Sequence, residues 1–190
     1  MNARLAIPLI MLLMAPLAAQ EETLISGAVT HGGFGGPSLK ITQLNGQAAV
    51  MTGSRAGWII NHTFVVGSSN YSLLSTVEVP NGTDYYLSLN YSGFELEYIP
   101  DSDKLIHYSI HTLFAPGSIH LKDDDFRRYT SNDFIYIFEP SLSITLNVVR
   151  FFRVSLSGNY RLVFDVDTDY LTNEDLGGAG AALTLKFGKF

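Results

Sequence analysis

The stretch that decides the fold is residues 134–148, FIYIFEPSLSITLNV, in which two kinds of side chain alternate. Its even-numbered positions are mostly aromatic or aliphatic, and its odd-numbered positions are mostly Ser, Thr, Asn and Glu. The next stretch, residues 152–166 (FRVSLSGNYRLVFDV), repeats the pattern. A period of two residues is that of a β-strand, whose successive side chains point to opposite faces. Both stretches therefore predict long strands with one apolar and one polar face.

The same alternation extends over most of the chain. We expect strands at residues 26–43, 47–60, 64–77, 85–98, 105–115, 134–148, 152–166 and 178–190. The connections between them form two alternating sets, one mostly short and one longer, of which residues 119–132 are the longest. Short turns at one end and longer loops at the other are typical of an outer-membrane barrel.

Two of these strands contain irregular positions. In the fourth, Leu87 and Leu89 differ in parity from Phe94 and Leu96. We expect a β-bulge beside Gly93 that brings both pairs to the same outward face. Pro140 has no N–H to donate to a neighbouring strand, which predicts a second bulge in the sixth strand.

The composition limits the class of protein. The chain has 190 residues, of which 46% are hydrophobic and 16% charged, and its net charge is −6. A soluble domain carries about 25% charged residues, so much of this surface is expected to face something other than water. The acidic balance argues against a nucleic-acid partner. Because the chain has no Cys, disulfides, thiolate metal sites, a Cys nucleophile and a lipoprotein anchor are excluded.

The first 20 residues, MNARLAIPLIMLLMAPLAAQ, have the pattern of a secretory signal peptide. Arg4 precedes an apolar run, and small residues follow near the expected cleavage site at Ala19 or Gln20. The run is shorter than the ~20 residues of a spanning helix. We therefore expect an exported chain whose single domain, residues 21–190, crosses a membrane with strands.

Alternation alone also fits a soluble β-sandwich or lipocalin-like barrel with its apolar face inside. Aromatic residues at the strand ends and charges of both signs on the opposite faces favour the inverted arrangement. The fold predicted is an all-β, eight-stranded antiparallel up-and-down transmembrane β-barrel in the cell outer membrane. The charged residues expected in its lumen are Lys40, Arg55, Glu95, Glu97, Glu139, Arg153, Arg161 and Lys186. Three Glu do not balance five Lys and Arg, so Asp165 or water is expected to help.

Three stretches resemble small eight-stranded outer-membrane barrels of Bacteroidetes-type bacteria. They are residues 32–61 (GGFGGPSLKITQLNGQAAVMTGSRAGWIIN), residues 133–163 (DFIYIFEPSLSITLNVVRFFRVSLSGNYRLV) and the ending LTLKFGKF. The resemblance implies a fold and no particular activity. It also implies that Phe190 is the signal read by the barrel-assembly machinery. Phe190 shares parity with Lys186 rather than with Phe187, so either Gly188 permits a bulge or the signal is read loosely.

The chain contains one catalytic candidate. His107 and Ser109 lie on one strand face and resemble the His-x-Ser of outer-membrane lipid A deacylases. Glu139 would orient the imidazole. However, Ile110 stands where that motif has Asn, and the parity directs these side chains into the lumen. Polar filling of the lumen is the simpler interpretation.

Other sites are not predicted. His107 and His111 are ~13 Å apart along a strand, too far to share a metal, and no cofactor is expected. Asp123, Asp124 and Asp125 do not have the spacing of a calcium loop. The leading hypothesis is a monomeric barrel with a structural or interaction role, a lumen closed by charged residues, and outer-membrane lipid and lipopolysaccharide as its surroundings. The alternatives are a narrow porin-like channel or small-solute conduit, and the lipid-modifying enzyme.

Overall fold

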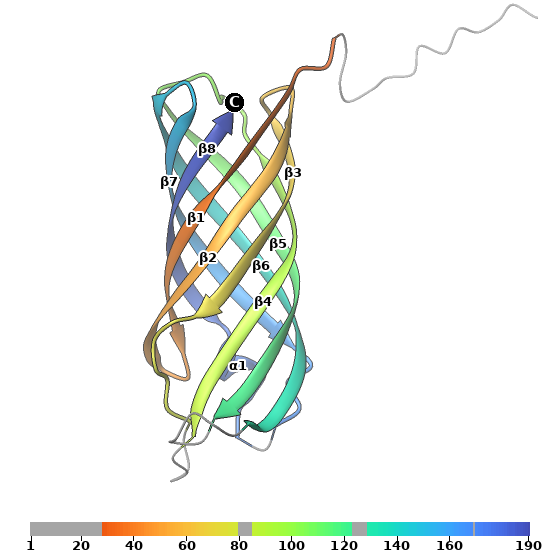
Figure 1. Ribbon diagram of the computed structural model, residues 1–190, viewed down its shortest axis with the longest axis vertical. Helices are drawn as coiled ribbons and strands as arrows, with labels where there is room; N and C mark the ends of the chain where they lie inside the picture. Colours follow the sequence, from red (N-terminus) through yellow and green to blue (C-terminus); the bar gives the residue numbers. More distant parts are fainter. Residues whose placement is uncertain (1–27, 80–84, 123–128, 169) are drawn as a thin grey trace, which may run out of the picture.

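The computed structural model describes residues 28–79, 85–122, 129–168 and 170–190. They form one closed antiparallel barrel in which each strand pairs with its neighbours in sequence and β1 pairs with β8 (Figure 1). The predicted eight-stranded up-and-down barrel is confirmed. The proposed signal peptide and the acidic run at residues 123–125 lie outside the described residues.

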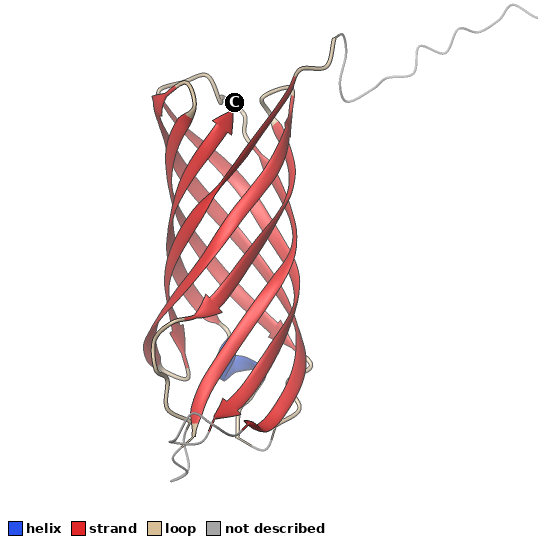
Figure 2. Ribbon diagram, viewed as in Figure 1, coloured by secondary structure: helices blue, strands red, loops and turns tan. Residues whose placement is uncertain are grey.

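The strands are β1 (His31–Leu44), β2 (Gln47–Ile60), β3 (Phe64–Leu73), β4 (Tyr86–Tyr98), β5 (Ile106–Lys122), β6 (Tyr129–Val149), β7 (Phe152–Phe164) and β8 (Gly178–Lys189). One short helix, α1 (Asn173–Leu176), lies between β7 and β8 at the mouth of the barrel (Figure 2). No helix among the described residues is long and apolar enough to cross a membrane.

The two ends of the barrel differ in their connections. We call the end with the C-terminus and the short β2–β3, β4–β5 and β6–β7 connections the turn end (Figure 1). The opposite end, with α1 and the longer β3–β4 and β7–β8 connections, is the loop end. The short β1–β2 connection, Asn45 and Gly46, also lies at the loop end. Both residues have the positive φ that a tight turn requires. The expected asymmetry of the two ends is therefore present.

The apolar faces of the long strands point outward. Tyr136, Leu146, Leu156 and Leu162 expose between 39% and 59% of their surface, whereas Ser143, Thr145 and Ser155 are buried inside. A soluble sandwich would pack the first set together in its core. The inverted arrangement predicted for these strands is confirmed.

The expected bulge beside Gly93 is wrong. The register of β4 with β3 is continuous from Asn90 to Tyr98, and Leu87, Leu89 and Tyr91 point into the lumen together with Glu95. A Cβ on Gly93 would lie 2.0 Å from the carbonyl oxygen of Phe114, so glycine is required by the close approach of β5. It is the polarity of the faces that changes along β4, and the backbone parity stays the same.

The bulge expected at Pro140 is also wrong. Pro140 stays in register opposite Thr112 of β5, and the β6–β7 pairs stop at Phe138 and resume at Ser141 without a shift. The strand thus loses ladder pairs on one side only. The register shifts instead at Leu121/Lys122 and near Asn147.

The long loop expected at residues 119–132 is mostly strand, because β5 extends to Lys122 and β6 begins at Tyr129. At the C-terminus, β8 pairs with β1 without a shift through Gly188, so Phe190 keeps its inward parity. Its ring stacks on that of Phe34 with centroids 6.3 Å apart. Of the two alternatives offered for Phe190, the bulge at Gly188 is therefore absent.

Candidate functional site

The lumen is the candidate functional site, and it is filled in layers. From the turn end these are a small apolar cluster, an ion-paired layer, a Lys–Glu–Tyr layer and a large apolar cluster at the loop end. The small cluster comprises Phe34, Ile59, Val65 and Ile99, with Phe190 packed against it. The two charged layers join residues from strands on opposite walls.

The first charged layer is centred on Arg55 of β2. Its guanidinium forms a bidentate ion pair with Glu95 and reaches Glu97 at 3.3 Å. Lys186 of β8 donates to Glu97 at 3.0 Å from the other side. Because β4 and β8 are four strands apart in a barrel of eight, this contact crosses the lumen. Each of these four residues is at most 3% exposed. The ion pairs are therefore buried, and each charge depends on its partner.

Two neutral donors complete this layer. Ser69 donates to Glu95, and Ser109 donates to Glu97 at 2.6 Å. The Nδ1 atom of His111 lies 3.3 Å from Arg55 Nη2 and 3.5 Å from Glu95 Oε1. The carboxylates are thus held by several strands at once, which fixes their orientation.

The second charged layer joins Lys40 of β1 to Glu139 of β6. Lys40 also donates to the hydroxyl of Tyr91 at 3.1 Å, and this hydroxyl donates to Glu139 at 3.2 Å. The ammonium lies 3.5 Å from the ring centroid of Tyr71, a cation–π contact that a buried site strengthens. These four residues close a ring of contacts across the barrel.

Arg161 of β7 is placed inside as predicted, but its partners are not carboxylates. Its guanidinium donates to the carbonyl of Leu176 at 2.7 Å, to the carbonyl of Gln43 at 3.0 Å and to the Thr42 hydroxyl at 3.3 Å. Arg161 therefore fastens α1, through Leu176, to the wall of the barrel. The helix is closed by a capping box of Thr172 and Asp175.

Arg153 lies at the turn end and is only partly buried. Its guanidinium carbon is 4.0 Å from the ring centroid of Phe190. Asp165, expected to balance the lumen charge, is exposed and has φ of 63° at the loop end. The excess of cations is met by backbone carbonyls and aromatic rings instead.

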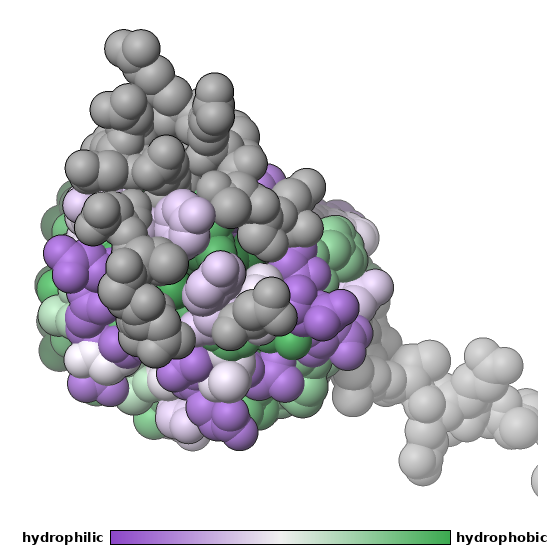
Figure 3. Space-filling model, turned by 90° about the horizontal axis from the view of Figure 1, so that it is seen from below, coloured by the Kyte–Doolittle hydropathy of each residue, from purple (hydrophilic) through white to green (hydrophobic). Residues whose placement is uncertain are grey.

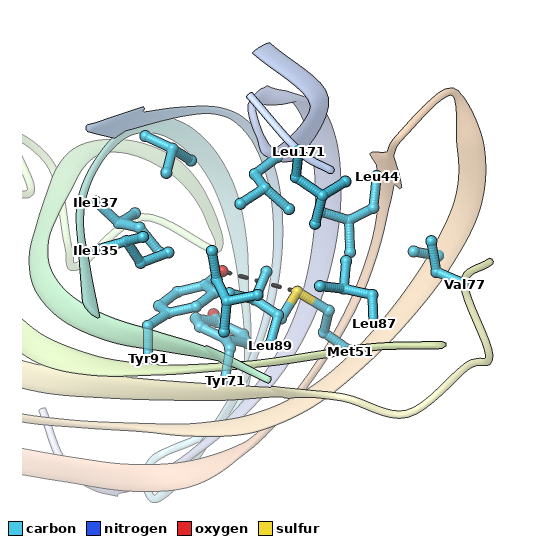
Figure 4. Close-up of a cluster of buried hydrophobic side chains, with 14 of the residues drawn as sticks. Leu44, Met51, Tyr71, Val77, Leu87, Leu89, Tyr91, Ile135, Ile137 and Leu171 are labelled. Atoms are coloured by element: carbon cyan, nitrogen blue, oxygen red, sulfur yellow. Dashed lines mark hydrogen bonds between the residues drawn. The ribbon is translucent and has the colours of Figure 1, made fainter. Parts of the chain in front are cut away.

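The loop half of the lumen is packed with apolar side chains (Figure 4). Wall residues such as Leu44, Leu89 and Ile135 meet Val77 and Leu171, which come from connections between strands and point inward. Leu176 of α1 joins them and is fully buried. Figure 4 also marks the 3.9 Å contact between the Tyr91 hydroxyl and the Met51 sulfur, where the cluster meets the Lys–Glu–Tyr layer.

Figure 3 views the loop end along the barrel. Hydrophilic residues form much of the described rim, and hydrophobic residues are visible between and behind them.

The residues of the catalytic hypothesis are directed to different partners. Ser109 bonds to Glu97, His107 Nδ1 lies 3.2 Å from the carbonyl oxygen of Lys104, and Glu139 pairs with Lys40. All three face the lumen, as the parity predicted. Ser109 is thus bound to a carboxylate within an ion-pair network, which agrees with polar filling.

Among the described residues, no group of three or more His, Asp or Glu is placed to hold a metal ion. His111, rejected as a ligand from its spacing, belongs to the Arg55 layer.

Sequence reasoning missed several members of the lumen. The inward positions of Tyr71 and Tyr91 were not predicted, because aromatic residues on a strand suggest a lipid-facing position. Leu171 and Leu176 lie in a connection that carries no strand pattern. The available signal was the odd parity of Tyr91, which matches that of Glu95 and Glu97.

Comparison with known proteins gives structural neighbours only. No protein-family model matches the chain, and no curated protein matches it in sequence. The N-terminal β-barrel domain of Pseudomonas aeruginosa OprF aligns with a TM-score of 0.58 and 10% identity, over 83% of this chain and 96% of that one.

Two further barrels align over nearly their whole length. Neisserial surface protein A (NspA) gives a TM-score of 0.53 at 12% identity, over 86% of this chain and 100% of its own. Ail, the attachment invasion locus protein of Yersinia pestis, gives 0.50 at 9% identity, over 86% of this chain and 99% of its own. At such identities the likeness concerns the fold. The chain thus has the fold of the small eight-stranded outer-membrane β-barrels.

Proposed function

We propose that this chain is an integral outer-membrane protein with a structural or interaction role, whose lumen is closed to solutes. The turn end would face the periplasm and the loop end the cell exterior. The apolar outer face would anchor the barrel in lipid, and the layered lumen would stiffen it. The loop end would make the external contacts.

The observation that carries this proposal is the contact between Lys186 and Glu97. It joins strands on opposite walls at 3.0 Å, and Arg55 meets the same carboxylate from a third strand. An eight-stranded barrel has an interior just wide enough for side chains to fill. The buried charges of this layer pair with one another, and the apolar cluster fills the lumen behind them. Together they would leave no open path along the axis.

Membrane residence is supported by the outer surface. Ile110, Leu142, Ile144 and Leu156 are each more than half exposed. A band of such residues on adjacent strands would be costly in water and is stabilising in hydrocarbon. Trp58, Tyr98 and Tyr108 are exposed near the turn end of their strands, the position of an aromatic girdle.

The test is conductance together with heat-modifiability. Purified in detergent, the folded chain should migrate differently from the boiled chain on a gel, and it should give no stepwise current in planar bilayers. Stepwise conductance would favour the porin-like alternative. Purification as a detergent-free soluble monomer would refute membrane residence.

The C-terminal residue belongs to the same proposal. Phe190 would be read by the barrel-assembly machinery before its ring packs on Phe34. Removing Phe190 should lower the amount of heat-modifiable barrel in cells, while the same variant should still refold from urea into detergent. Equal assembly in cells would exclude Phe190 as the signal.

A further inference from the structure

The outer wall of the barrel carries an uncharged polar patch on β2 to β5, toward the loop end. Its members have outward parity, are exposed or half-exposed, and are all Ser, Thr or Asn. They are Thr52, Ser54, Asn70, Ser72, Ser88, Asn90, Ser92 and Ser118.

Strand register makes this patch continuous. Thr52 pairs with Ser72, which pairs with Asn90, which pairs with Ser118. In the adjacent row Ser54 pairs with Asn70, and Asn70 pairs with Ser92. The side chains of one row therefore stand next to those of the other on the same face of the sheet.

Behind the patch, the inward side chains of the same strands are mostly apolar, although Arg55 and Ser69 lie directly beside Ser54 and Asn70. Leu87, Leu89, Leu113 and Ile119 belong to the buried cluster of the loop half. This part of the wall has the polarity of a soluble barrel, apolar inside and polar outside. Asn70 donates to the Ser54 hydroxyl at 2.6 Å, but one such bond does not satisfy all the hydroxyls and amides of the patch. Facing acyl chains would be costly for the remaining groups, so this wall belongs beside polar groups.

The patch is hollowed. A groove of about 430 Å³ crosses β3 to β6 and is lined by Asn70, Ser72, Asn90, Ser92, Ser118 and Phe134, among others. None of its lining residues carries a charge. The exposed ring of Phe134 stands at one side of the groove. With Pro116 and Phe134 beside the hydroxyl and amide groups, the groove suits a neutral ligand that presents both hydroxyls and an apolar face, and it offers little to a phosphate.

An aromatic row borders the groove on the turn side. Phe94 pairs with Phe114, which pairs with Phe138, and the last two rings are 4.9 Å apart. Ser92 and Phe94 are successive outward residues of β4. The wall therefore changes from hydrogen-bonding to aromatic over one step along the strand.

We propose that this groove binds the uncharged sugar headgroup of a glycolipid in the surrounding membrane. Asn70, Asn90, Ser92 and Ser118 hydrogen-bond the sugar hydroxyls, Phe134 packs against a sugar face, and the acyl chains lie over the Phe94–Phe138 row. The groove opens sideways from the wall, so a ligand anchored in the bilayer beside the barrel reaches it directly. This proposal rests on the proposed membrane residence.

The test is competition between two lipids. The full chain is placed in phosphatidylcholine nanodiscs that contain equal amounts of a diglucosyl diacylglycerol and a phosphatidylglycerol with the same acyl chains. Lipid that stays bound is measured by native mass spectrometry. The glycolipid should be enriched, and Asn90→Ala with Ser92→Ala should reduce that enrichment about fivefold for each hydrogen bond lost.

A matched control is Thr112→Ala, which alters another outward polar residue of β5 that does not line the groove. It should leave the enrichment unchanged. Equal retention of both lipids, or enrichment that survives the double substitution, overturns the proposal. Heat-modifiability measured on the same samples separates this failure from failure of membrane residence.

Because the chain has no Cys, a single cysteine gives a second readout. Ser92→Cys should react with a water-soluble maleimide in nanodiscs without glycolipid and should be protected when the diglucosyl lipid is added. Leu156→Cys on the apolar wall should stay unreactive in both. If the glycolipid does not change the labelling of Ser92→Cys, this wall only faces water. If Ser92→Cys forms a disulfide dimer, the wall is an interface between copies of the chain. Either result overturns the proposal.

Discussion

The two halves of the lumen are closed by different physical means. Toward the turn end, Arg55, Glu97 and Lys186 exchange ion pairs across the barrel. Toward the loop end, Leu89, Ile135 and Leu176 pack as a protein core does. On β4 the outer face is polar where the inner face is apolar, at Ser88 and Asn90, and apolar where the inner face is charged, at Phe94 and Leu96.

This difference shows how one strand can serve two environments. β4 presents Leu87 and Leu89 inward in one half and Glu95 and Glu97 inward in the other, with no change of register. A side chain's face is set by backbone parity, while the preferred polarity of that face is set by what lies outside. The two halves should therefore respond differently to substitution.

The largest expected effect is at Glu97. Glu97→Ala removes the shared partner of Arg55 and Lys186 and leaves two buried cations short of a carboxylate. Breaking a buried pair in this way costs about 3–5 kcal/mol. Urea unfolding from lipid vesicles should measure the loss, and adding Lys186→Leu should recover part of it. A double variant as unstable as Glu97→Ala would show that the pair is not the source of the loss.

Truncating a side chain of the large apolar cluster should cost somewhat less stability. Leu176→Ala leaves a cavity in the loop half, where Leu176 is fully buried, and should destabilise by about 2–4 kcal/mol. The same unfolding assay measures it. Leu183→Ala, on the exposed outer face, is the control and should cost less in the same vesicles. Equal losses would mean that Leu176 is not packed in a core.

Between the two halves, Tyr91→Phe tests the hydroxyl that joins Lys40 to Glu139. The ring is retained, so only the hydrogen bonds are lost, at about 1–2 kcal/mol. Tyr91→Phe in a Glu139→Gln background should cost less than in the parent chain, because the two residues act together. If the stability losses of Tyr91→Phe and Glu139→Gln simply add, the two residues do not act together.

The smallest effect is expected on the polar outer wall. Ser88→Ala should change stability by less than about 0.5 kcal/mol, whereas Leu89→Ala next to it should cost about 2–4 kcal/mol. The pair compares an outward with an inward residue of one strand, with Leu89 fully buried. A larger loss at Ser88 would contradict the assigned parity of β4.

Much of the barrel could be predicted because alternation is a local property. Over residues 134–148 of β6 and along β7 the apolar face is outward, so the period of two residues and the identity of the faces agree. The inward positions of Lys40, Arg55, Glu139 and Lys186 followed from the same parity. In β4 the alternation of positions and the polarity of the side chains point to different faces. The polarity predicted that Leu87 and Leu89 face outward, whereas the unbroken parity places them inside.

The amino-acid sequence by itself determined the strand number, the antiparallel order and the placement of charged residues on the inner face, because each depends on the alternation and turns of neighbouring residues. Only the tertiary structure decided which charges meet, that Arg161 binds the carbonyl of Leu176 rather than a carboxylate, and that the connections supply Val77 and Leu171 to the loop half. The physical reason is closure. Contacts between opposite walls depend on the stagger of all the strands together, and no single segment contains that information.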